Sequence, residues 1–320
     1  MLPPVRVSTC HPDVEREDPL ISPVVVNRHR RILRRYLWTR RESIHQVPEL
    51  VAQGANNALY RIYLNEKPVL AKIGMNPFYR KLHIEYAVLR QVAPLSPEPI
   101  DFFNDARSGL QVLLLKQLDG RHPDVLEDTD IAAIGRIIAA FHTGIPPIDA
   151  VPTEQGMSFI RNRVLQVRST GGLQTYRDRF KKLYDVLLGY ADRPGVTPHP
   201  DQNVLVHGDL VPRNIIMEPD GAARIIDWEG ARYDVPEADL ATFLKAYRIT
   251  GARREHFFSA YGLPVDRNRF ALRLAVHYLQ VIAWRLTMQL SREYGKRYDE
   301  VVAELDEELD IAEELIERLH

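Results

Sequence analysis

The chain has 320 residues, 45% of them apolar, and its 42 Lys and Arg nearly balance its 43 Asp and Glu for a net charge of −1. So weak an overall charge argues against nucleic acid or a membrane surface as a partner, and the single cysteine, Cys10, excludes an intramolecular disulfide and a cysteine-based zinc site. No apolar run approaches the roughly 20 residues of a membrane span or resembles a signal peptide, so we expect a cytoplasmic protein of two domains or two lobes.

The N-terminal region is predicted to begin with an arm and a helix. Residues 1–26 are interrupted by prolines and show no helical period, which predicts an extended arm. Residues 27–41 place apolar side chains on one face and arginines on the others, which predicts a helix packed on the first lobe with its charges in solvent. Such a helix could also bind nucleic acid, but neither a second basic segment nor an aromatic platform accompanies it.

A small sheet carrying one helix is predicted next. Apolar segments bounded by turn residues predict strands, and Leu82, Tyr86 and Leu89 have helical spacing. The predicted strands cover 47–53, 58–64, 69–73, 100–103 and 109–115, and the predicted helix covers 82–92.

Beyond Gly120 the predicted structure is mostly helical. Helices are predicted over 130–142, over 176–190 and again to the C-terminus, with short strands over 204–207, 215–217 and 223–226. In the last helix, apolar residues from Val302 to Leu319 form a narrow stripe. We expect this stripe to pack on its own lobe, and a dimer seam is the alternative, so the sequence allows a monomer or a homodimer.

Three polar side chains beside these short strands meet the requirements of phosphoryl transfer. Asp209 follows an apolar strand and can accept the proton of an attacking hydroxyl, while Asn214 and Asp227 offer oxygen ligands that suit Mg²⁺. The turn-forming segment 218–221 predicts a hairpin with Asn214 and Asp227 at its two ends, so these side chains should lie side by side. Each residue alone is common in loops, but all of them in this order predict a kinase active site.

At these residues the chain resembles the aminoglycoside phosphotransferase / choline kinase superfamily, whose members are protein-kinase-like kinases of small molecules. The segment from His207 to Leu240 is similar to its two signature motifs, and Asp239-Leu240-Ala241 is similar to the Asp-Leu-Ala that follows them in the family. The resemblance implies an α+β, bilobal fold. A nucleotide-binding lobe over 27–117 would contain a small antiparallel sheet and one main helix, and a larger, mostly helical lobe over 118–320 would provide catalysis and substrate binding.

The resemblance also implies a role for each residue of these motifs. Asp209 would be the catalytic base, Asn214 and Asp227 the magnesium ligands, and Asp239 a buried aspartate that braces the catalytic loop. We expect His207 to be structural as well, because it can hydrogen-bond the backbone of that loop.

A nucleotide site in the first lobe follows from the same resemblance. Lys72 resembles the strand lysine that contacts the α- and β-phosphates, and Glu85 on the next helix is its expected partner. In the segment that links the lobes, Lys116 and Leu118 would offer backbone groups to a purine. The predicted nucleotide-binding loop lies between the first two strands and comprises Gly54, Ala55, Asn56 and Asn57.

We therefore expect a Mg²⁺-dependent kinase that transfers the γ-phosphoryl group of ATP or GTP to a hydroxyl group of a small molecule. The expected acceptor site lies in the second lobe near Glu229, Tyr233, Asp234 and Glu237, whose carboxylates would suit a cation such as an aminoglycoside or choline; Glu229 could instead lie beside the metal. The alternatives are a metabolic kinase of the choline, homoserine, methylthioribose or thiamine type, and a non-catalytic pseudokinase. No nucleic acid or membrane partner is expected.

Overall fold

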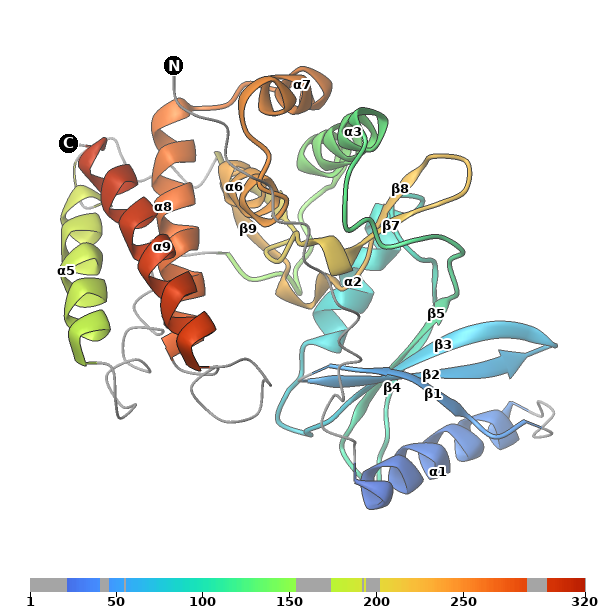
Figure 1. The fold of residues 1–320 in the computed structure, drawn as a ribbon. Helices are drawn as coiled ribbons and strands as arrows, with labels where there is room; N and C mark the ends of the chain where they lie inside the picture. Colours follow the sequence, from blue (N-terminus) through green and yellow to red (C-terminus); the bar gives the residue numbers. More distant parts are fainter. Residues whose placement is uncertain are drawn as a thin grey trace.

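The computed structural model describes residues 22–40, 46–54, 56–153, 174–191, 193, 202–286 and 298–319. Within these ranges the chain forms a smaller lobe on an antiparallel sheet and a larger lobe made mostly of helices, as predicted (Figure 1). Residues 1–21 of the predicted arm and Ala55 of the predicted nucleotide loop lie outside the described ranges.

The smaller lobe is built on a five-stranded antiparallel sheet. Its strands are β1 (Glu49–Gln53), β2 (Asn57–Leu64), β3 (Lys67–Gly74), β4 (Pro99–Asn104) and β5 (Gln111–Lys116), in the spatial order β1-β2-β3-β5-β4. All five lie close to their predicted bounds. A two-residue turn joins β2 to β3, and both of its residues, Asn65 and Glu66, have positive φ, which matches the twist of a tight hairpin.

One face of the sheet packs against α1 (Pro23–Thr39), where Ile32 and Tyr60 belong to a shared core. The helix begins at Pro23 rather than at residue 27, so residues 23–26 belong to the helix and not to an extended arm. Proline suits this position because the first turn of a helix needs no amide donor.

The opposite face packs against α2 (Leu82–Val92), whose bounds agree with the prediction. Leu113 of β5 and Leu89 of α2 belong to a core that continues into the larger lobe, and Figure 1 shows α2 between the sheet and that lobe. Lys72 of β3 pairs with Leu113 in the sheet. Because residues paired directly across neighbouring strands project to the same face of a sheet, Lys72 points toward α2 and the larger lobe.

The connection that follows α2 ties the two lobes together. Ile225 of the larger lobe donates its backbone N–H to the carbonyl of Leu95 at 3.0 Å, and the Trp228 indole N–H donates to the hydroxyl of Ser96 at 2.9 Å. The Trp228 side chain is fully buried. These bonds join the end of α2 to the predicted catalytic hairpin, so the helix is held in a defined position beside it.

The larger lobe combines helices with short strands. Its helices are α3 (Asp128–Gly144), α5 (Gln174–Ala191), α6 (Glu237–Ala246), α7 (Gly251–Tyr261), α8 (Arg267–Trp284) and α9 (Tyr298–Glu317). Its strands are β6 (Val204–Val206), β7 (Ile215–Met217), β8 (Ala223–Ile225) and β9 (Arg232–Asp234). β7 and β8 form the predicted hairpin, whereas β9, which the sequence pattern did not predict, pairs with β6. None of the described helices is long and apolar enough to cross a membrane.

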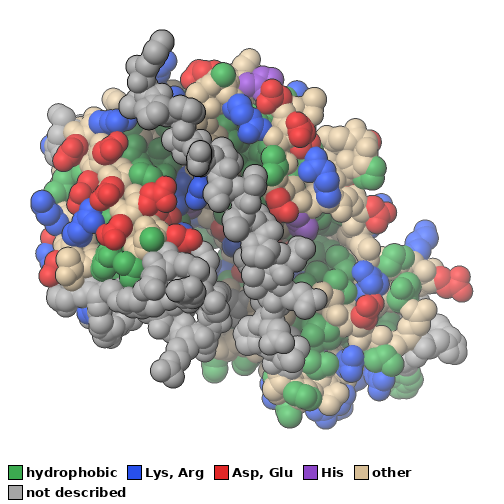
Figure 2. All heavy atoms as spheres, viewed as in Figure 1, with side chains coloured by type: hydrophobic (Ala, Val, Ile, Leu, Met, Phe, Trp, Pro, Cys, Tyr) green, Lys and Arg blue, Asp and Glu red, His purple; other side chains and the backbone are tan. Residues whose placement is uncertain are grey.

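The last helix, α9, packs side by side with α5 and α8 (Figure 1). The central part of its apolar stripe, from Leu305 to Ile316, is buried among them, so the stripe packs on its own lobe, as expected. Acidic side chains gather over these helices (Figure 2), where Arg179 of α5 lies 2.8 Å from Asp310 and 3.1 Å from Glu313. Part of the negative charge of α9 is therefore compensated by its neighbour.

Candidate active site

Asp239 holds the loop that follows β6. Its side chain is fully buried in the first turn of α6 and accepts the backbone N–H groups of His207 at 2.7 Å and Gly208 at 2.9 Å. Burial alone would raise the pKa of Asp239, but the hydrogen bond and charge of His142 hold that pKa below its usual range. The ionised carboxylate therefore accepts both amide groups and fixes the loop backbone.

The buried His207 ring also binds backbone groups of this loop. Its Nδ1 accepts the N–H of Asp209 at 3.2 Å, which places the ring proton on Nε2, and Nε2 donates to the carbonyl of Ile226 at 2.9 Å. The ring also packs edge-on against Trp228. Both nitrogens are therefore engaged in holding the loop against the β7–β8 hairpin.

Gly208 has no room for a side chain. Its φ is +83°, and a Cβ atom would lie 2.4 Å from the carbonyl oxygen of Gly230 and equally close to the Arg232 guanidinium. Only glycine combines the left-handed backbone with this close approach. The loop can therefore turn sharply just before Asp209.

Asp209 and Asn214 are in direct contact. The Asn214 Nδ2 donates to the backbone carbonyl of Asp209 at 2.8 Å and to its carboxylate at 3.1 Å. Asn214 ends a 3₁₀ turn that directly precedes β7. Its own carbonyl accepts the N–H of Ile226 at 3.0 Å. The hairpin therefore brings Asn214 beside the segment that carries Asp227.

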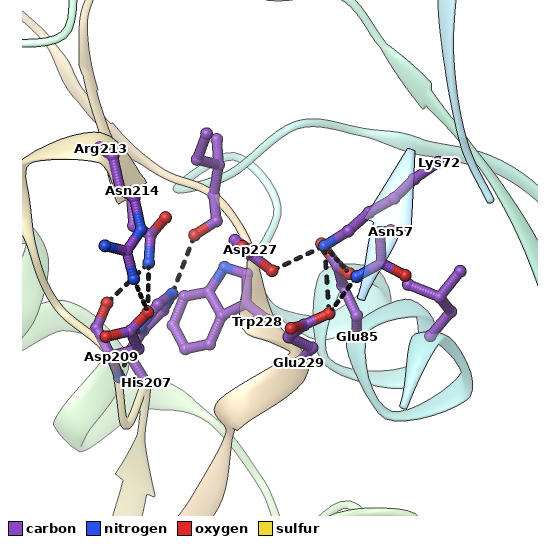
Figure 3. A network of polar contacts seen from close by, with 12 residues as sticks. Asn57, Lys72, Glu85, His207, Asp209, Arg213, Asn214, Asp227, Trp228 and Glu229 are labelled. Atoms are coloured by element: carbon purple, nitrogen blue, oxygen red, sulfur yellow. Dashed lines mark hydrogen bonds and ion pairs between the residues drawn. The ribbon is translucent and has the colours of Figure 1, made fainter. Parts of the chain in front are cut away.

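Lys72 connects the two lobes through an ion-pair cluster. Its Nζ lies 2.7 Å from Glu85 of α2 and 2.6 Å from Asp227, and Glu229 lies 3.6 Å away (Figure 3). Asp227 follows β8 in the left-handed backbone conformation, with φ of +67°. The structure thus brings together three predicted residues from β3, α2 and the end of the hairpin.

This cluster carries surplus negative charge, because three carboxylates surround one ammonium group. Burial would lower the pKa of Lys72, but the carboxylates of Glu85 and Asp227 hold it well above its usual value. Burial raises the pKa of Glu85 to about 7, against the opposing effect of Lys72. Lys72 therefore stays charged, and an additional cation would be stabilised beside it.

Magnesium fits this donor set. Glu85, Asp227 and Glu229 each offer a carboxylate oxygen, and the three oxygens lie within 4.8 Å of one another. Carboxylate oxygens are the hard ligands that Mg²⁺ prefers, and Mg²⁺ usually takes only one or two of them together with water and phosphate. Asp227 is common to this group and to the predicted ligand pair with Asn214.

Glu229 faces the smaller lobe instead of lining an open acceptor site. Its carboxylate accepts hydrogen bonds from the side-chain amide of Asn57 and, at 3.1 Å, from the hydroxyl of Tyr79. Burial and the Glu229 charge raise the pKa of Tyr79, so its hydroxyl keeps the proton that it donates. No motif pointed to Tyr79, because it lies in the irregular loop between β3 and α2 and only the fold brings it here.

The predicted nucleotide loop forms a tight connection between β1 and β2. The Gly54 N–H donates to the carbonyl of Asn57, and the Met75 N–H donates to the carbonyl of Asn56, both at 2.8 Å. These bonds hold the backbone beside β3. The Asn57 side chain is buried and reaches Glu229, so this loop also borders the ion-pair cluster.

Two of the acidic residues assigned to the acceptor site are buried with arginine partners, which corrects the expectation of an acidic wall. Asp234, 2% exposed, binds Arg232 and Arg273. Glu237, fully buried, lies 3.3 Å from Arg269. Their charges are therefore compensated inside the larger lobe.

Tyr233, the fourth residue assigned to the acceptor site, also has structural contacts. Its hydroxyl accepts the backbone N–H of Ile148 at 2.7 Å, which ties β9 to the segment after α3.

The segment that links the lobes contains Lys116 and Leu118. Lys116 ends β5 with an exposed side chain, and its N–H donates to the carbonyl of Glu98 at 2.9 Å, so that amide is engaged within the smaller lobe. Leu118 is half-buried two residues further on. At Gly120 a Cβ atom would lie 2.6 Å from the carbonyl oxygen of Met217, so the connection closely approaches the β7–β8 hairpin there.

Comparisons with known proteins identify the family and the fold. A model of the phosphotransferase enzyme family matches residues 47–274. A search of curated proteins finds no match. Among solved structures, the choline kinase LicA from Streptococcus pneumoniae matches with a TM-score of 0.64 at 17% identity, over 89% of this chain and 98% of that chain.

Two antibiotic phosphotransferases are similar as well. Spectinomycin phosphotransferase APH(9)-Ia, in complex with ADP and spectinomycin, matches with a TM-score of 0.63 at 15% identity, over 84% of this chain and 93% of that chain. A macrolide 2'-phosphotransferase type I matches with a TM-score of 0.60 at 16% identity, over 91% and 98%. The predicted bilobal, protein-kinase-like fold is confirmed.

Proposed function

Because this chain belongs to the phosphotransferase enzyme family, within the superfamily that its motifs resemble, we propose that it transfers the γ-phosphoryl group of ATP or GTP to a hydroxyl group of a small molecule. The observation that carries the proposal is the position of Lys72 between Glu85 of the smaller lobe and Asp227 of the larger one. It joins the expected phosphate-binding and metal-binding groups in one site.

Asp209 is the proposed catalytic base. Its carboxylate is 45% exposed and is oriented by Asn214, so it can accept the proton of an acceptor hydroxyl as that oxygen attacks the γ-phosphorus. Magnesium held by Asp227 and Asn214 would offset the charge of the phosphates. Lys72, oriented by Glu85, would exchange Asp227 for oxygens of the phosphates that are not transferred.

Glu229 belongs, in this proposal, to the nucleotide side of the site. Its contacts with Lys72, Asn57 and Tyr79 favour a role beside the metal and the nucleotide loop over a role in acceptor binding.

Several chemical classes of acceptor are compatible with this function. The solved relatives named above act on choline, spectinomycin or macrolides by their names. The arginine partners of Asp234 and Glu237 remove the main reason to prefer a cationic acceptor. A metabolic hydroxyl compound, such as a sugar, an amino alcohol or a vitamin, is therefore a candidate acceptor alongside an antibiotic.

A panel of hydroxylated acceptors with Mg²⁺ and ATP or GTP tests the function. We expect nucleoside diphosphate release above the acceptor-free rate with at least one aminoglycoside, macrolide, amino alcohol, sugar or vitamin. Calorimetry with the nucleotide alone provides the complementary measurement. If neither ATP nor GTP binds in the presence of Mg²⁺, the proposal is wrong and the fold serves a non-catalytic role.

A further inference from the structure

Arg213 forms an ion pair with the proposed base. Its guanidinium Nη2 lies 2.8 Å from the Asp209 carboxylate, four residues earlier in the chain. The Arg213 side chain is 73% exposed, and Figure 3 shows it beside Asn214 above Asp209. No motif had assigned it a role.

The fold does not depend on this side chain. The turn that carries Arg213 is held by backbone bonds, including that from the Asn214 N–H to the carbonyl of Val211 at 2.9 Å. Within the described part of the chain, Asp209 is the one side-chain partner of Arg213. An exposed ion pair of this kind contributes little to stability, so the guanidinium can exchange Asp209 for another anion at little cost.

The charge of Arg213 acts on both carboxylates of the proposed reaction. It binds Asp209 directly. Burial alone would raise the pKa of Asp227, but the charges of Lys72 and Arg213 contribute to holding it below its usual range. The guanidinium therefore lies at the proposed base, the point from which an acceptor hydroxyl bound to that base would attack the γ-phosphorus.

We propose that Arg213 is a further catalytic residue, whose guanidinium leaves Asp209 and binds the γ-phosphoryl group during transfer. The inference rests on the proposed function. As the acceptor oxygen forms its bond to the γ-phosphorus, the bond from that phosphorus to the bridging oxygen breaks, and its electron pair stays on the nucleoside diphosphate. The acceptor proton goes to Asp209, while Arg213 keeps its own proton throughout.

Two physical effects follow from this movement. A planar guanidinium can bind two phosphoryl oxygens at once, which suits the charge spread over that group in the transition state. Its departure also frees one hydrogen-bonding position on Asp209 Oδ2, which Asn214 Nδ2 still binds at 3.1 Å, and that position becomes available to the acceptor hydroxyl.

A transition-state mimic separates this role from simple nucleotide binding. The probes are ADP with Mg²⁺, and ADP with Mg²⁺ and aluminium fluoride, which mimics the phosphoryl group in the transition state of transfer. We expect Arg213→Met to bind ADP within about twofold of the unchanged protein, but to bind the aluminium fluoride complex about 100-fold more weakly, the usual loss for one transition-state donor. Arg213→Lys, which keeps the charge without the planar fork, should lose about tenfold. Acceptor-independent ATP hydrolysis should fall in parallel.

Arg318→Met is the matched control. Arg318 also pairs with an acidic residue four positions earlier, Glu314, with side chains 75% and 68% exposed, at the far end of α9. This variant should behave like the unchanged protein with both probes.

The outcomes separate this inference from the proposed function. If Arg213→Met keeps both the affinity for the aluminium fluoride complex and the hydrolysis rate, Arg213 is not catalytic. If it loses ADP affinity equally, Arg213 acts in ground-state binding and the inference is also wrong. If the unchanged protein neither binds the complex nor hydrolyses ATP, the proposed function itself fails.

Discussion

Lys72 of the smaller lobe and Asp227 of the larger lobe form an ion pair of 2.6 Å. The pair joins elements that are far apart in the chain, a central strand of the sheet and the end of the β7–β8 hairpin. Lys72 is 8% exposed, so its charge depends on carboxylate partners instead of water. One side chain, Lys72, therefore links the two lobes electrostatically.

Replacing Lys72 should affect both stability and nucleotide binding. Lys72→Met leaves Glu85 and Asp227 without their shared cation, and we expect the free energy of unfolding to fall by about 3–5 kcal/mol because buried carboxylates lose their partner. Urea unfolding measures this loss. In the double variant Lys72→Met/Glu85→Gln part of it should return, since one uncompensated charge is gone. A double variant as unstable as the sum of its single changes would contradict this electrostatic account.

Replacing the proposed base should reduce catalysis with little effect on folding. Asp209→Asn keeps the shape of a side chain that is 45% exposed but cannot accept a proton, so we expect the transfer rate to fall about 10²–10⁴-fold. Nucleoside diphosphate release with the best acceptor measures the rate, and calorimetry should show nearly unchanged nucleotide affinity. Transfer at the unchanged rate would exclude Asp209 as the base.

Gly208 and Gly221 provide a matched pair for testing the loop geometry. Both have positive φ, +83° and +84°, but a Cβ atom at Gly208 would meet the Gly230 carbonyl at 2.4 Å, whereas at Gly221 it would meet nothing within 4 Å. Gly221→Ala should cost about 1 kcal/mol of unfolding free energy through backbone strain alone. Gly208→Ala should cost about 1–3 kcal/mol more through the clash and should also reduce transfer. Equal costs would show that the loop has room to relax.

His29 should make stability depend on pH. Burial lowers the pKa of His29 from 6.5 to about 4, and its Nδ1 lies 3.1 Å from the hydroxyl of Tyr60 beneath α1. The unfolded chain therefore binds this proton more readily than the folded one between pH 6.5 and 4. The stabilisation is fully present above pH 6.5 and is lost as the pH falls toward 4, by up to about 3 kcal/mol.

Urea unfolding at pH 7.5 and 4.5 tests this contribution. We expect the difference between the two pH values to be smaller in His29→Gln than in the unchanged protein. His83→Gln, at an exposed position of α2, is the control and should keep the full difference. The same difference in His29→Gln as in the unchanged protein would assign the pH dependence to other groups.

Those features of the fold and the site that depend on residues close together in the chain could be predicted from the sequence. Periodicity and turn residues predicted all five strands of the sheet and the bounds of α2, because these depend on neighbours a few residues apart. In the same way, the turn residues of segment 218–221 predicted the β7–β8 hairpin. This hairpin brings Asn214 beside the segment that carries Asp227. β9 was not predicted, because Arg232, Tyr233 and Asp234 lack the apolar side chains that marked the other short strands.

The candidate residues could be identified from the sequence, but their surroundings depend on the tertiary structure. The hairpin pattern selected Asp227, and the family resemblance selected Lys72 and Glu85. Neither could show that Glu229 faces the smaller lobe or that Asp234 is covered by Arg273, 39 residues further along. Nor could they reveal the pairing of Arg213 with Asp209. Burial and charge compensation depend on which distant segments pack together, and periodicity along one segment carries no information about that packing.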